Sequence, residues 1–255
     1  MDPRKNTARF YDTVSHPIND EAFYLEKIKS LKEKNVLELG CGTGRILVPL
    51  AKLCDKIVGV DYSQEMLNVC GEKLAKEGIT NAQTFEGNIT TLNLGETFDL
   101  VIAPYRVIQS LETDEEVHGF LETISLHMKS NGRGILNAFR PKISAEEMRS
   151  SWCKPDEIID QEIMLKDGSR LVYSFRQHKI DKEKLVIYPD IIYRKYLKDI
   201  LVEEVIHPIK MRCYYPDEFK QLITDMGFTI TSLWGGYNNE EYGVGPELVI
   251  EFIKK

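Results

Sequence analysis

Residues 36–45 read Val-Leu-Glu-Leu-Gly-Cys-Gly-Thr-Gly-Arg, and this stretch decides the fold. A short apolar strand runs straight into Gly40, Gly42 and Gly44, and a helical segment follows at 45–53. Glycine has no Cβ, so the backbone can turn sharply there and approach a ligand more closely than a side chain would permit. The pattern predicts a strand–turn–helix unit at the carboxyl edge of a parallel sheet, where a nucleotide-like cofactor binds.

The spacing of the glycines separates this turn from two other nucleotide-binding loops. It is Gly-x-Gly-x-Gly rather than G-x-G-x-x-G, and no Lys-Ser or Lys-Thr follows as in a P-loop. A second strand-like segment, 57–60, ends at Asp61, which lies 17 residues beyond Gly44. A carboxylate there can accept hydrogen bonds from both hydroxyls of a ribose. Together the two signals predict a binding site for a nucleoside-containing cofactor.

The remaining segments alternate as in a doubly wound sheet. Helices are expected at 23–31 and 45–53, from the N-cap Ser63 to Gly78, from the capping box of Thr113 and Glu116, and from Pro216 to Gly227. Strands are expected at 36–39, 57–60, 83–85, 98–102, 135–139, 228–234 and 247–253. Residues 158–213 show strand-like alternation, with a hairpin signal at Asp167-Gly168. We therefore expect an α/β, Rossmann-like, seven-stranded mixed sheet formed by 1–149 and 214–255, with an antiparallel β-rich lid at 150–213.

Composition restricts the class of partner. The 33 basic and 40 acidic residues give a net charge of −7, which disfavours a nucleic-acid partner. Five scattered cysteines without C-x-x-C spacing predict reduced thiols, a cytoplasmic protein and no metal site. The sequence contains no apolar run long enough for a membrane span. We expect a protein that acts without a membrane, as a monomer or homodimer.

Residues 36–45 and 58–61 resemble the first two motifs of the class I S-adenosylmethionine-dependent methyltransferases. The resemblance implies S-adenosylmethionine as cofactor and S-adenosylhomocysteine as product. Gly87-Asn88-Ile89 is similar to the third motif, although the family more often has Asp where this chain has Asn88. The fourth resembles residues 98–105, whose end lies beside the transferable methyl group. The cofactor residues that the resemblance implies are Tyr11, Glu38, Gly40, Cys41, Gly42, Gly44, Asp61, Tyr62, Met66, Asn88, Ile89 and Ala103.

An N-terminal Tyr11-Asp12 pair resembles an element of bacterial small-molecule N-methyltransferases, including amino-sugar dimethyltransferases whose insertion covers the site. Tyr11 and Tyr105 are candidates to face the sulfonium, since an aromatic ring attracts a cation. His207 is the candidate proton acceptor, with His178 as the other option. His118 and His127 are expected on an exposed helix face. Candidate substrate-binding residues are Arg106, Gln109, Arg140 and Trp152, and the tyrosines at 188, 193, 196, 214 and 215 are expected to stabilise the insertion.

The predicted reaction is direct displacement, which moves a methyl group to a small-molecule acceptor. An amine is the first choice of acceptor, and a hydroxyl or carboxylate is the second. Three alternatives remain: a catalytically silent S-adenosylmethionine-binding partner subunit, an RNA methyltransferase, and a nicotinamide-dependent oxidoreductase. The glycine spacing disfavours the last of these.

Overall fold

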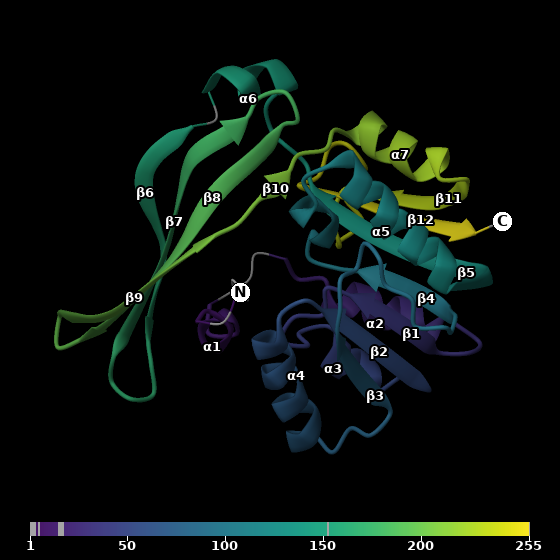
Figure 1. Cartoon of the computed structure of the whole chain (residues 1–255), viewed down its shortest axis with the longest axis horizontal. Helices are drawn as coiled ribbons and strands as arrows, with labels where there is room; N and C mark the ends of the chain where they lie inside the picture. Colours follow the sequence, from purple (N-terminus) through teal and green to yellow (C-terminus); the bar gives the residue numbers. More distant parts are fainter. Residues whose placement is uncertain (1–3, 5, 15–17, 152, 255) are drawn as a thin grey trace.

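The computed structural model describes residue 4 and residues 6–14, 18–151 and 153–254. A seven-stranded sheet in the order β11-β12-β5-β4-β1-β2-β3 forms its centre (Figure 1). β12 runs antiparallel to both β5 and β11, and the other neighbouring pairs are parallel. The expected mixed, Rossmann-like sheet is confirmed. Its strands are β1 (Asn35–Leu39), β2 (Lys56–Asp61), β3 (Ala82–Glu86), β4 (Phe98–Ala103), β5 (Met128–Phe139), β11 (Phe228–Trp234) and β12 (Glu247–Lys254).

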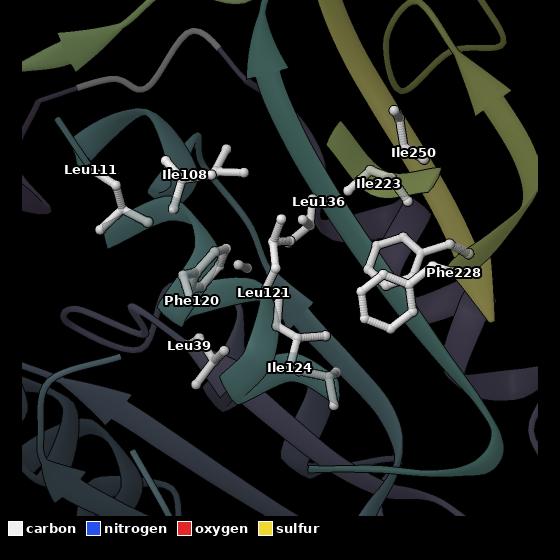
Figure 2. Packing of buried hydrophobic residues seen from close by; sticks show 14 of the residues in the cluster. Leu39, Ile108, Leu111, Phe120, Leu121, Ile124, Leu136, Ile223, Phe228 and Ile250 are labelled. Carbon is white, nitrogen blue, oxygen red and sulfur yellow. The ribbon is translucent and has the colours of Figure 1, made fainter. Parts of the chain in front are cut away.

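Helices cover both faces of this sheet because successive strand residues point to opposite sides. In β4, Leu100 and Ile102 join the cluster that packs under α2 (Glu21–Lys29), α3 (Leu47–Ala51) and α4 (Gln64–Lys76). Val101 and Ala103 join the cluster on the other face, under α5 (Asp114–His127) and α7 (Pro216–Asp225). Figure 2 shows part of the latter cluster, where Phe120, Leu121 and Ile124 of α5 lie near Leu136 of β5.

The expected capping residues are present at the starts of α4 and α5, but one expectation about a helix face is wrong. The Ser63 hydroxyl accepts a hydrogen bond from Met66 N–H, and Thr113 forms its capping box with Glu116. The expectation that His127 lies on an exposed face is wrong. Its side chain is buried, with Nδ1 2.7 Å from the carbonyl oxygen of Thr123, and Nε2 accepts a hydrogen bond from a loop amide.

Residues 154–212 form a second, antiparallel sheet. It contains β6 (Lys154–Met164), β7 (Arg170–Asp181), β8 (Val186–Leu197), β9 (Ile200–Pro208) and β10 (Met211–Arg212). Gly168, with φ of +79°, stands in the predicted hairpin turn between β6 and β7. The short helix α6 (Ala145–Ser151) precedes this sheet and was not predicted. Among the described residues, no helix is long and apolar enough to cross a membrane.

Strand register brings particular side chains of the second sheet together. Phe175 is paired with Ile191, which is paired with His207, and the next row contains Tyr173, Tyr193 and Val205. The N-terminal helix α1 (Ala8–Tyr11) packs against this surface and also contacts α4 (Figure 1). Its Phe10 ring stacks on Tyr193 with the centroids 5.6 Å apart. Helix α1 therefore links the second sheet to the central domain.

Candidate functional site

A cavity of about 1460 Å³ lies between the carboxyl ends of the central strands, α1 and the second sheet. Among the described residues, the structure places four of the predicted site residues, Gly44, Ala103, Gln109 and Arg140, outside its lining. Trp152 lies outside the described residues. The predicted residues that line the cavity are Tyr11, Glu38, Gly40, Cys41, Gly42, Asp61, Tyr62, Met66, Asn88, Ile89, Tyr105, Arg106 and His207.

The three loop glycines have different reasons to be glycine, although all three have positive φ. A Cβ at Gly40 would lie 2.5 Å from Val107, and one at Gly44 would lie 2.5 Å from Cys70 Sγ. No atom lies within 4 Å of a Cβ placed at Gly42. Gly40 and Gly44 thus permit close protein packing, whereas Gly42 leaves open space in the cavity wall.

The Asp61 carboxylate fixes the shape of this loop. Its Oδ2 accepts a hydrogen bond from Gly42 N–H at 2.9 Å, and its Oδ1 accepts one from Ser63 N–H at 2.9 Å. Each carboxylate oxygen has two lone pairs and can accept more than one hydrogen bond. The group is therefore positioned to accept hydrogen bonds from ribose hydroxyls.

Glu38 is a buried carboxylate in the cavity wall. Its Oε2 is buried and has no hydrogen-bond partner among the described residues. Burial raises the pKa of Glu38 well above its ordinary value, and the nearby Arg45 opposes this shift. A buried acceptor without a partner is costly in free energy. The ammonium of the cofactor's methionine part is a donor that would satisfy it, so the residues present fit S-adenosylmethionine.

Arg45 connects this carboxylate to the end of β4. Its guanidinium is held by the fully buried Asp20, with Nη2 3.0 Å from Oδ2, and lies 4.9 Å from the ring centroid of Tyr105. Tyr105 and Arg106 have φ of +57° and +67°, a conformation that costs free energy in residues with a side chain. The strand end beside the cavity is therefore held in a strained conformation.

The N-terminal segment is attached directly to the glycine loop. Thr43 Oγ1 donates to Asp12 Oδ1 at 2.8 Å, and Lys73 Nζ lies 2.6 Å from Asp12 Oδ2. Arg4 Nε donates to the hydroxyl of Tyr62 at 3.2 Å. These contacts place Tyr11 in the cavity wall.

The predicted substrate-binding residues Gln109, Arg140 and Arg106 mainly make hydrogen bonds within the protein. Gln109 is buried. Its side-chain Nε2 donates to the carbonyl oxygen of Arg212, and its Oε1 accepts from the N–H of Phe139, both at 2.7 Å. Arg140 donates to the carbonyl oxygens of residues 244 and 245. Arg106 lines the cavity, but its Nε donates to Glu247 at 3.2 Å. The structure therefore brings only Arg106 of these three to the cavity.

Both candidate histidines come from the second sheet and line the cavity. His207, near the end of β9, is buried beside Ile191 of β8. His178 is exposed, and its Nδ1 lies 3.6 Å from Asp190 Oδ2. Asp190 also accepts a hydrogen bond from Arg176 at 2.8 Å.

The wall residues that the sequence-based prediction missed include Thr43, Arg45, Tyr173 and Tyr193. Arg45 ends the glycine-rich stretch, and this position next to the predicted cofactor loop could have identified it as a residue of the cavity wall. Tyr173 belongs to the alternation of Leu171, Tyr173 and Phe175, which predicts a shared face but not what that face covers.

Comparisons with known proteins agree with this geometry. Residues 36–132 match the family model described as a methyltransferase domain. A protein named as a methyltransferase in Geobacillus sp. (strain WCH70) is 24% identical over 97% of this chain and 98% of its own length. Two solved structures share the fold. The CcbJ methyltransferase of Streptomyces caelestis has a TM-score of 0.80, with 19% identity and coverage of 99% of this chain and 98% of that one.

The second structure is the sugar N-methyltransferase KedS8 of Streptoalloteichus sp. ATCC 53650. It has a TM-score of 0.74, with 14% identity and coverage of 97% of this chain and 92% of that one. At these identities the two structures establish the fold, and the family model adds the motifs around the glycine loop. The glycine loop, Asp61, the methyltransferase-domain model over residues 36–132 and the shared fold together support a class I S-adenosylmethionine-dependent methyltransferase, with S-adenosylmethionine as its cofactor.

Proposed function

We propose that the protein methylates a small-molecule amine. The observation that carries this proposal is that a single cavity is lined both by the glycine loop and by the second sheet. A cavity of about 1460 Å³ exceeds what one drug-sized ligand usually fills, so it has room for a cofactor and an acceptor together. The amine is suggested by the sugar N-methyltransferase KedS8, which shares the fold over nearly the whole chain.

S-adenosylmethionine, when bound, supplies a methyl group on a sulfonium cation. Glu38 and Asp61 accept hydrogen bonds from its ammonium and ribose groups, and the open space at Gly42 accommodates it. The rings of Tyr11 and Tyr105 face the same cavity and favour a cation there. The loop and the strand end thereby orient the reacting group, and correct positioning supplies several kcal/mol of the barrier reduction.

The second sheet acts as a lid that excludes water from the reaction. Its β8 residue Tyr188 donates a hydrogen bond to Glu112 at 2.6 Å, and Arg212 of β10 lies 2.7 Å from Asp114. Asp114 is the first residue of α5, and Glu112 lies two residues before it. These contacts hold the lid against the central domain.

His207 holds the proton that the amine loses. Its imidazole is buried in the cavity wall, on β9 beside Ile191 of β8. Neutral imidazole is a suitable proton acceptor near neutral pH. His178 is more exposed and lies beside Asp190, which makes it the alternative acceptor.

The test is release of S-adenosylhomocysteine from the purified protein with matched panels of amines, alcohols and carboxylic acids. We expect turnover with amines alone. A folded protein that methylates only alcohols or acids would contradict the proposal, and one that methylates only RNA would establish the RNA alternative. A protein that binds S-adenosylhomocysteine but turns over none of these acceptors would establish the silent partner subunit.

A variant pair tests the proton acceptor. His207→Gln should lower kcat about 10²-fold or more, with partial recovery at higher pH where the free amine deprotonates unaided. His118→Gln is the matched control because His118 is exposed on α5, away from the cavity. Equal rates in the two variants would remove His207 from this role.

A further inference from the structure

Four of the tyrosines that line the cavity come from three separate parts of the chain. Tyr11 comes from α1, Tyr105 follows β4, and Tyr173 and Tyr193 come from β7 and β8 of the lid. The rings of Tyr173 and Tyr193 have centroids 5.3 Å apart. Phe10 supports Tyr193 from its other side. We call these four residues the tyrosine cluster.

The members of the tyrosine cluster all line the same cavity, and two of their rings are in contact. Each of the four phenol groups lies close enough to the other three for their charges to interact. Burial raises the pKa of every member, that of Tyr173 to about 12. The four groups therefore remain neutral phenols at physiological pH, and they present aromatic rings and hydroxyl dipoles to the cavity.

The charged side chains around the tyrosine cluster are compatible with a cation bound there. Asp160 of β6 lines the cavity beside Tyr173 and interacts with it electrostatically. The guanidinium of Arg45, which faces Tyr105, is already paired with the buried Asp20. Arg4 lies near Tyr11 and donates its hydrogen bond to Tyr62. The charge of Arg45 is thus paired with a carboxylate, Arg4 is hydrogen-bonded to a phenol, and the carboxylate of Asp160 lies on the lid side of the cluster.

We propose that the tyrosine cluster binds the nitrogen-centred head of the acceptor and accepts alkylated ammonium groups. Several aromatic rings around one point attract an ammonium group that carries methyl substituents, because the ring faces are negative. Tyr173 and Tyr193 are then specificity-determining residues supplied by the lid. This inference rests on the proposed function, since it specifies the chemical class of acceptor for the same cavity.

The position of Tyr173 supports a binding role over packing alone, whereas Tyr193 is buried in the same cluster as Leu171. In the neighbouring row of the same face, Leu171 is fully buried among apolar side chains. Tyr173 is only partly buried and borders the cavity. An apolar residue would satisfy the packing, whereas a tyrosine adds a ring face and a hydroxyl where the acceptor must lie.

The test is a binding measurement that needs no turnover. Choline and its neutral isostere 3,3-dimethylbutan-1-ol have the same shape and differ in charge. Calorimetric titration of each probe into protein saturated with S-adenosylhomocysteine should show that choline binds about tenfold more tightly or better, as expected for a cation among desolvated rings. Equal affinities for the two probes would overturn the proposal without any variant.

Variants then locate the effect. Tyr173→Leu and Tyr193→Leu should each remove most of the preference for choline, while Tyr173→Phe should retain most of it because the ring remains. Tyr196→Leu is the matched control on β8, since Tyr196 lies outside the cavity lining and beside Arg170. A preference that survives both leucine variants would also overturn the proposal.

Binding of S-adenosylhomocysteine to each protein separates the two proposals. If the wild-type protein does not bind it, the proposed function fails. If it binds normally and choline shows no preference, only the role of the tyrosine cluster fails.

Discussion

Substitution of Gly42 by alanine should separate cofactor binding from folding. The residue has φ of +54°, and an added Cβ meets no protein atom within 4 Å. The protein itself therefore accommodates the methyl group, and the only folding cost is that of a left-handed conformation, about 1–2 kcal/mol. For a chain of this size, that cost lowers Tm by about 2–4 °C for each kcal/mol.

The expected effect on the cofactor is larger. The added methyl group occupies space that the bound cofactor needs, and such an overlap costs about 1–3 kcal/mol. This corresponds to a loss of affinity of about fivefold to 150-fold. Calorimetric titration with S-adenosylhomocysteine measures the loss, and thermal unfolding without ligand measures the folding cost.

Gly78→Ala is the matched control. Gly78 ends α4 with φ of +65°, and a Cβ there also meets no atom within 4 Å, but the residue lies outside the cavity lining. Both variants should lose similar stability, and only Gly42→Ala should lose affinity. Wild-type affinity in Gly42→Ala would refute the assignment of this space to the cofactor.

Three further variants test other parts of the site. Gly44→Ala should destabilise more than Gly42→Ala in thermal unfolding, because its Cβ would lie 2.5 Å from Cys70 Sγ; equal Tm values would contradict the close packing. Gln109→Leu should cost about 1–3 kcal/mol for each backbone group that it leaves unpaired, as measured by urea unfolding. The pKa of Glu38 is raised in the folded protein, so wild-type stability should increase as pH falls through that pKa. Glu38→Gln should be more stable than wild type at about pH 8 and lose this advantage near the ordinary pKa of 4.5, and a constant difference would contradict the buried carboxylate.

The central sheet could be predicted closely because its signals are local. Strand alternation, the capping residues Ser63 and Thr113, and Gly227 mark where elements begin or end, and these determine topology in a doubly wound sheet. Boundaries without such punctuation were less accurate: β5 begins at Met128 rather than residue 135, and α3 at Leu47 rather than residue 45.

Side-chain roles depended on long-range contacts that sequence patterns do not contain. Arg140 follows the fifth strand and Gln109 follows the fourth motif, which are positions where a substrate-binding residue can lie. Both side chains instead form hydrogen bonds with backbone groups distant in the sequence. His127 is buried because the loop before β4 donates a hydrogen bond to it. Tyr193 was expected only to stabilise the insertion, since its place in the cavity wall results from the docking of α1.

The most direct test of the account is titration of the purified protein with S-adenosylhomocysteine, followed by competition with NAD. We predict micromolar binding that NAD does not displace and that Asp61→Ala abolishes. A folded wild-type protein that binds no S-adenosylhomocysteine, or that releases it to NAD, would contradict the assignment of the glycine loop and Asp61 to this cofactor.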